Sequence, residues 1–198
     1  MSDIAERYRS RADDFERKVA AVLPEQWSNQ SPCDDWLALD VVRHIVIMHA
    51  AMLSPIGREL SAAPTLDDDP LQAFVSARAD VEEVLADAVL SAEEIGTPGG
   101  AMTVAEHIDR VVSADLVLHG WDLARATGQD ETMDPAEVEA MWAANTAVPP
   151  EVMEKLRTPG AFGPGVVVFG PEVPVPADAP LQDRLLGSIG RDPKADSR

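Results

Sequence analysis

The sequence predicts an all-α protein, a four-helix bundle followed by short C-terminal helices and an irregular Pro/Gly-rich strap. Apolar residues recur at steps of three and four along most of the first 128 residues, which is the period of one helical face. The prolines of this region fall between the periodic segments and not inside them. A chain of 198 residues suffices for one compact core with an appended lobe, but not for two full domains.

The first two helices are delimited by proline. The first spans about residues 3–23 and ends before Pro24. The second runs from about residue 39 to 54, where Pro55 and Gly57 stop it. It is apolar on nearly all sides, so we expect it at the centre of the bundle. The first helix carries a single apolar stripe, formed by Ile4, Tyr8, Phe15, Val19 and Val22.

The third and fourth helices are separated by a run of breakers at residues 96–100. The third begins at Pro70, which fits a first helical turn. The fourth runs from Thr103 to Ala126, with Gly128 at the expected C-terminal stop. The residues predicted to face inward on the third helix are Leu71, Phe74, Val75, Val81, Val84, Leu85 and Val89.

The chain changes character after the bundle. A helix is predicted over residues 134–147, with Asp134 capping it. Residues 158–180 hold six Pro and four Gly, which predicts an irregular strap, pinned to the bundle by Val166, Val167, Val168 and Phe169. A last helix covers residues 181–188. We therefore expect one domain over 1–198, with the bundle at 3–128, C-terminal helices and strap at 129–191, and a mobile tail at 192–198.

Composition excludes two classes of partner. The chain has 16 Lys and Arg against 35 Asp and Glu, a formal charge of -19, which would repel a phosphate backbone or an anionic lipid surface. The single thiol, Cys33, cannot form an intramolecular disulfide, and the polar start has no apolar signal core. The longest apolar stretch, residues 45–53, is about half of the ~20 residues that a membrane span needs. We expect a cytoplasmic protein with neither nucleic acid nor membrane as partner.

Acidic residues interrupt the apolar stripe of the fourth helix, because Asp115 and Asp122 fall on its inward face. Burying an unpaired carboxylate is costly, so each should be neutralised, hydrogen-bonded or coordinated. His119 lies four residues after Asp115, which places both side chains on one face of the helix. A pair at this spacing can offer one oxygen and one nitrogen to a shared ion.

A third donor is available on the second helix. His44 is surrounded by apolar residues in the sequence and is predicted to point into the core. Together with Asp115 and His119 it would make an open site of two imidazoles and one carboxylate for a divalent metal. Asp122, one turn past His119, is expected either to orient a ligand from behind or to make a hydrogen bond that faces its own helix.

The same residues have plainer interpretations, which spacing alone leaves open. An isolated histidine in an apolar helix is more often a hydrogen-bonded core residue, and an Asp–His pair four residues apart is more often a helix-stabilising contact. His49 projects about 140° away from His44 and is predicted to pack in the core or lie at the rim. Cys33 is interpreted as a small buried residue, and Trp36 as core or edge packing.

Five segments carry a family resemblance. They are Cys33–Trp36, Val41–His44, Ser113–Gly128, Phe169–Pro176 and Asp183–Pro193. Together they resemble the actinobacterial branch of the DinB-like metal-binding superfamily, which is related to the N-terminal domain of mycothiol-dependent maleylpyruvate isomerase. The resemblance extends over most of the chain.

The resemblance implies a fold, a ligand set and a chemistry. The helices would follow the up-down-down-up order, and His44, Asp115 and His119 would bind a divalent ion, zinc first, with nickel or iron as alternatives. The ion would bind a small thiol, mycothiol in an actinobacterium, and hold it as a thiolate for attack on an electrophilic substrate. The expected function is therefore a metal-dependent thiol S-transferase or isomerase.

Two departures from the family pattern limit this expectation. Asp115 stands where the isomerase has Glu, so its carboxylate is one methylene shorter. The separate C-terminal domain of the isomerase is replaced here by the strap, so the substrate does not carry over. Two alternatives stay open: a non-catalytic bundle whose metal, if any, is structural, and a metal-free bundle in which hydrogen bonds satisfy Asp115. Assembly into a homodimer is also left open.

Overall fold

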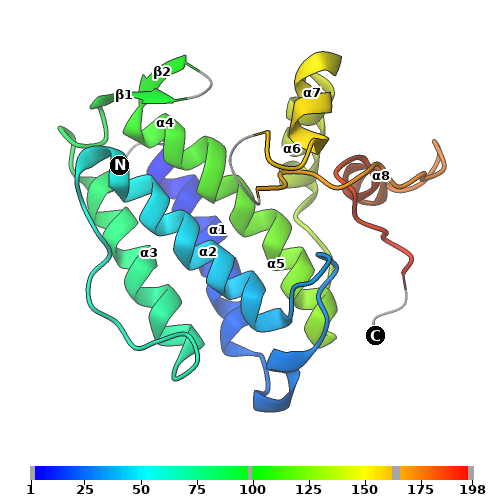
Figure 1. Cartoon of the computed structure of the whole chain (residues 1–198), viewed down its shortest axis with the longest axis horizontal. Coiled ribbons are helices and arrows are strands. Elements are labelled where there is room, and N and C mark those ends of the chain that lie inside the picture. The colour runs from blue at the N-terminus through cyan, green and yellow to red at the C-terminus, as the bar shows by residue number, and fades with distance from the viewer. Residues whose placement is uncertain (1–2, 98–99, 162–165, 196–198) are drawn as a thin grey trace. The chain divides into compact units, whose positions relative to one another are not determined.

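The computed structural model describes residues 3–97, 100–161 and 166–195 (Figure 1). The chain divides into two compact units, the first ending at Glu131 and the second beginning at Thr132. The described residues are mostly helical, and the strands among them form a single two-stranded hairpin. The predicted all-α class is therefore confirmed. The prediction of one domain over the whole chain stays a prediction.

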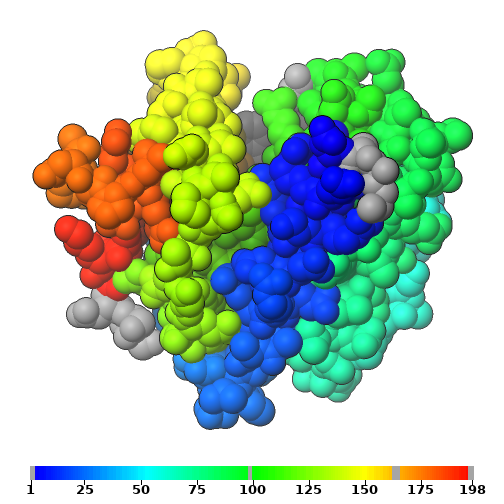
Figure 2. All heavy atoms as spheres, turned by 180° about the vertical axis from the view of Figure 1, so that it is seen from behind, coloured from blue at the N-terminus to red at the C-terminus, as the bar shows by residue number. Residues whose placement is uncertain are grey.

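Four long helical segments build the first unit, and each lies close to where the sequence predicts it. Helix α2 packs against α3 and α5, and α1 packs against the same two helices from the other side. Figure 1 shows α2 in front, and Figure 2 shows α1 at the surface of the opposite face, beside α3. The elements are α1 (Asp3–Ala20), the 3-10 turns η1 (Pro24–Ser28) and η2 (Ser54–Ile56), α2 (Ala38–Leu53), α3 (Pro70–Ala86), α4 (Val104–Ile108), the π-helical turn η3 (Asp109–Ser113) and α5 (Ala114–Thr127).

The core of this unit lies between the four helical segments. Burying each large apolar side chain contributes about 1.5–3 kcal/mol relative to leaving it in water. By length and a mean hydropathy of 1.4, the segment Ala38–Ile56 could also cross a membrane, but here it is the core helix α2, with Val41 and Ile45 fully buried. The largest fully buried apolar side chains of the first unit are Trp121, Tyr8, Phe15, Phe74, Ile45, Leu53, Ile108, Leu116 and Leu123.

The fourth helical segment contains a feature that the sequence did not predict. Its start is as expected, because Thr103 and Glu106 form a reciprocal capping box. The turn η3 is π-helical, and such a turn holds one more residue than an α-helical turn. The buried positions therefore shift by one, so that Leu116 is buried in place of Asp115, which we expected to face inward, and Val112 is buried one turn before it. Asp115 lies half-buried at the rim, with 26% of its side chain exposed.

The connection between α3 and α4 also differs from the prediction. Helix α3 ends at Ala86 because the Asp87 carboxylate accepts the N–H groups of Val89 and Leu90, which begin a turn. The prediction that Val89 faces inward is wrong, since this residue is 80% exposed. An antiparallel hairpin follows, made of β1 (Glu94–Thr97) and β2 (Gly100–Thr103), where we expected a loop.

The second unit is built from three short helices and the strap. Asp134 caps α6 (Pro135–Thr146) as predicted, by accepting the N–H groups of its first turn. Helix α8 (Leu181–Ser188) matches its predicted bounds and packs against α6, whereas α7 (Pro150–Arg157) was not predicted.

The strap packs on α8 through backbone contacts. The Val173 N–H donates to the Gly187 carbonyl at 2.9 Å, and a Cβ atom at Gly187 would lie 2.7 Å from the Val173 carbonyl oxygen. Val166, Val167 and Val168 are 41%, 55% and 41% exposed, and their predicted contact with the bundle stays a prediction. The last residues of the predicted mobile tail, 196–198, lie outside the described residues.

Candidate metal centre

The structure brings together the three predicted ligands, on two helices that pack against each other. His44 lies on α2, and Asp115 and His119 lie one turn apart on α5. One donor atom from each residue, a ring nitrogen or a carboxylate oxygen, lies within 4.8 Å of the donor atoms of the other two. Three such donors can therefore meet at a single cation after small side-chain movements.

The rim of this group is open to solvent. His44 Nε2 lies 3.3 Å from Asp115 Oδ2, and each of the two side chains is 26% exposed. The imidazole rings of His44 and His119 lie edge to face, with centroids 4.6 Å apart. A small molecule can thus approach the group from the side of His44 and Asp115, while His119 closes it on the inner side.

His119 is held by a buried carboxylate. Its side chain is 9% exposed, and Nδ1 lies 2.8 Å from Oδ2 of Asp122, whose side chain is fully buried. With Asp122 ionised, the carboxylate can only accept, so the ring proton then lies on Nδ1 and the Nε2 lone pair is available to a ligand. The role of Asp122 in orienting a metal ligand stays a prediction, which this contact supports. Carboxylates commonly orient metal-binding imidazoles in this way.

A loop before α2 contributes two residues whose role sequence reasoning missed. Trp36 packs on both histidines, with its ring centroid 4.9 Å from that of His44 and 5.7 Å from that of His119, to which it is nearly parallel. Cys33 is half-buried, and its Sγ lies 3.4 Å from Asp122 Oδ2. The signal was present in the sequence, because the segment from Cys33 to Trp36 carries part of the family resemblance.

A second histidine of α2, His49, stays out of the site. It is fully buried, its Nδ1 donates to the Ile45 carbonyl at 2.7 Å, and its Nε2 accepts from the Tyr8 hydroxyl at 2.7 Å. Burial lowers the pKa of His49 to about 4. Of the two places predicted for His49, the core and the rim, the structure shows the core.

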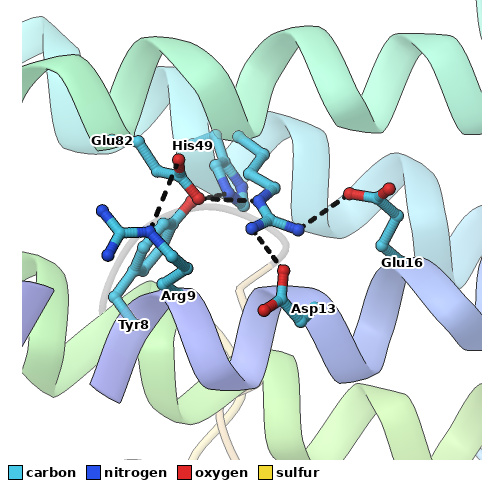
Figure 3. A network of polar contacts seen from close by, with 7 residues as sticks. Tyr8, Arg9, Asp13, Glu16, His49 and Glu82 are labelled. Atoms are coloured by element: carbon cyan, nitrogen blue, oxygen red, sulfur yellow. Dashed lines mark hydrogen bonds and ion pairs between the residues drawn. The ribbon is translucent and has the colours of Figure 1, made fainter. Parts of the chain in front are cut away.

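A network of charged residues neighbours Tyr8 and His49 (Figure 3). Its centre is Arg78 of α3, whose side chain is 12% exposed and contacts carboxylates of Asp13, Glu16 and Glu82. Arg9 also contacts Glu82, at 3.9 Å. These charges are paired with one another, so the network binds α1 to α3 and offers no metal-ligand set.

The chemistry of the donor set fits a divalent cation. Two imidazoles and one carboxylate suit zinc, nickel or iron, and three protein ligands leave further coordination positions for a small molecule. The contact between His119 and Asp122 supplies the outer support that such sites commonly have. A second group of donors, Cys33, His119 and Asp122, also has its atoms within 4.8 Å of one another.

Comparisons with known proteins bear on this region directly. The family model described as the mycothiol maleylpyruvate isomerase N-terminal domain matches residues 8–124, which contain the predicted ligands. An uncharacterized protein found in two strains of Mycobacterium tuberculosis is 29% identical over 183 residues, which are 90% of this chain and 92% of that protein. The crystal structure of a mutant of the mycothiol-dependent maleylpyruvate isomerase matches with a TM-score of 0.52 and 13% identity, covering 80% of this chain and 73% of that one. The structural likeness supports the predicted DinB-like fold, and the family model shows that this chain belongs to the mycothiol maleylpyruvate isomerase N-terminal domain family.

Proposed function

We propose that this protein is a cytoplasmic metal-dependent enzyme that uses a small thiol of the mycothiol type in S-transfer to, or isomerisation of, an electrophilic substrate. The observation that carries the proposal is the convergence of His44, Asp115 and His119 at a rim where the first two side chains are partly exposed. Membership of the family supports the same assignment. Donors that served only the stability of the bundle would have no need of an approach from solvent.

Each residue of the centre has a separate task in this proposal. His44, Asp115 and His119 would hold the ion, and Asp122 would keep His119 in the tautomer whose Nε2 faces it. When bound, the ion supplies Lewis acidity that lowers the pKa of a coordinating thiol and so makes it a nucleophile at neutral pH. Trp36 packs on both imidazoles and would limit the movement of their rings.

The short side chain of Asp115 defines the geometry of the rim. Its carboxylate lies 3.3 Å from His44 Nε2, so it already reaches the imidazole of the neighbouring helix without the extra methylene of a glutamate. The π-helical turn before α5 brings Asp115 out of the core to this position. Zinc is the first choice for such a set, and nickel or iron would take the same donors.

The described side chains of the first unit do not identify the substrate. Arg125, which could have met a substrate carboxylate, contacts Glu131 at 2.7 Å and lies over the Trp121 ring. We therefore assign the substrate by reactivity alone, as a small molecule with an electrophilic carbon.

Metal binding followed by thiol binding tests the proposal. The Cys33→Ser variant should be loaded with cobalt and titrated with a small thiol, because any sulfur-to-metal absorption then comes from the added thiol. We expect such a band, with one ion per chain. Asp115→Asn should weaken metal binding by about 10-fold or more, and His44→Ala should remove the band.

The matched control is His49→Gln, a substitution on the same helix that should leave the cobalt spectrum unchanged. Failure to bind any stoichiometric divalent ion would overturn the proposal. Ion binding with no response to thiols would leave only the structural role of the metal.

A further inference from the structure

We propose that Cys33, His119 and Asp122 form a second cation site, selective for thiophilic ions, that shares His119 with the first donor set. The donors are a cysteine sulfur, an imidazole nitrogen and a carboxylate oxygen, all within 4.8 Å of one another. Thiolates favour soft or borderline cations, whereas the set of His44, Asp115 and His119 contains no sulfur. Binding at the second site stands on these three residues, and only its competition with the first site rests on the proposed function.

The loop before α2 fixes the position of the Cys33 sulfur. Gln30 and Leu37 pair as an isolated β-bridge that closes the loop at its base. The Cys33 N–H donates to Ser31 Oγ at 3.2 Å, and the Trp36 N–H donates to the Cys33 carbonyl at 3.2 Å.

Asp35 completes this turn, with a φ of 61°, a left-handed conformation that Asp tolerates better than most residues. These contacts present the thiol to Asp122, a residue 89 positions later in the sequence. The backbone of the loop therefore holds the Cys33 sulfur in place beside Asp122.

The hydrogen bonds inside the group mark the place of the ion. Asp122 Oδ2 lies 2.8 Å from His119 Nδ1 and 3.4 Å from Cys33 Sγ, so one carboxylate oxygen faces both other donors. A cation would replace the two protons that now lie between them. The thiol proton leaves to solvent, and the ring proton of His119 moves from Nδ1 to Nε2, so that Nδ1 can coordinate.

This movement of the ring proton makes the two sites exclude each other. A neutral imidazole has one nitrogen lone pair for coordination, and His119 offers it through Nε2 to the first set or through Nδ1 to the second. The chain should therefore bind one ion at a time through His119. A thiophilic ion would take His119 from the first set and so block the proposed enzyme centre.

Cadmium chloride titrated into the metal-free full-length protein, with no added thiol, tests the second site. Cys33 is the single cysteine of the chain, so a sulfur-to-cadmium absorption band in the ultraviolet reports this residue alone. We expect a band that saturates at one ion per chain. Cys33→Ser should remove it and weaken cadmium binding by about 10-fold or more.

The matched control is His44→Ala, which changes only the first donor set and should keep the cadmium band. A band that is absent from the wild-type protein at saturating cadmium, or lost in His44→Ala, would overturn the second site. A second readout needs no variant: cadmium should slow alkylation of Cys33 by iodoacetamide, and an unchanged rate would also overturn the site. If the first set fails to bind cobalt while the cadmium band stands, the proposed function fails and this inference does not.

Discussion

His44 and His49 lie on the same helix and in different chemical surroundings. His44 is 26% exposed, and its Nε2 has the Asp115 carboxylate at 3.3 Å, with the ring of Trp36 against it. His49 is fully buried, and both of its ring nitrogens are bound within the chain, by Tyr8 and by the Ile45 carbonyl. His44 can therefore exchange its contact with Asp115 for an ion, whereas His49 would have to break a buried hydrogen bond to bind one.

The comparison shows how a structural histidine can be told from a candidate ligand. Burial alone does not separate them, because His119 is also buried. The difference lies in the partners of the second nitrogen. One ring nitrogen of His119 contacts Asp122, and donor atoms of His44 and Asp115 lie near the same ring. Both ring nitrogens of His49, in contrast, make hydrogen bonds in the core.

The largest expected effect concerns the acid stability of the metal-free protein, through His49. In the unfolded chain this imidazole takes up a proton below its ordinary pKa of 6.5, but in the fold it stays neutral down to a pKa of about 4. The unfolded state therefore binds more protons in this window, and the free energy of unfolding should fall by about 3 kcal/mol as pH decreases from 6.5 to 4.

Denaturant unfolding at a series of pH values measures this loss. The His49→Gln variant should lack this part of the pH dependence, although other groups of the protein still titrate. Parallel pH profiles for the wild-type protein and His49→Gln would show that the buried ring does not control acid stability.

The next effect concerns the support of His119. Asp122→Asn should weaken metal binding at the first donor set by about 10- to 100-fold, because a neutral amide holds the imidazole less firmly than a carboxylate. The matched substitution is Asp109→Asn, which removes a 2.7 Å ion pair with Arg7 and touches no donor. Isothermal titration with zinc compares the two variants, and equal affinities would remove Asp122 from the support of the site.

The smallest effect concerns the partner of His49. Tyr8→Phe removes the hydroxyl that donates to His49 Nε2 and leaves a buried acceptor without its donor, which should cost about 1 kcal/mol of stability. Zinc affinity should stay at the wild-type value, because no donor of the metal centre changes. A variant with lower zinc affinity and unchanged melting would reverse the roles that we assign to the two histidines of α2.

The sequence predicted the long helices well, because their apolar period is regular and proline or glycine marks their ends. It did not predict the turn η3, since one extra residue in a continuous apolar helix leaves the local pattern almost intact. Helix α7 was missed because it has no buried residue, and the hairpin was missed because Ile95 is the single buried residue of its two strands.

The candidate site was predicted in part for the same physical reasons. Asp115 and His119 are related by helical spacing, which sequence alone reveals, and His44 stands out as a polar residue in an apolar helix. The positions of Cys33 and Trp36 depend on the path of a loop. That path is determined by the backbone of Asp35 and the bridge between Gln30 and Leu37, and no periodic pattern encodes either of them.

The π-helical turn also bears on how related sequences should be compared with this one. Each residue rotates an α-helix by about 100°, and a π-helical turn takes one more residue for about the same rotation, so a homologue that lacked one residue between Ile108 and Ala114 and had a regular α-helix there would keep the remainder of that helix at about the same angle. Its acidic and imidazole groups would then face the same neighbouring helix as here. An alignment gap of one position in this stretch therefore does not by itself separate proteins that share the centre from proteins that only share the bundle.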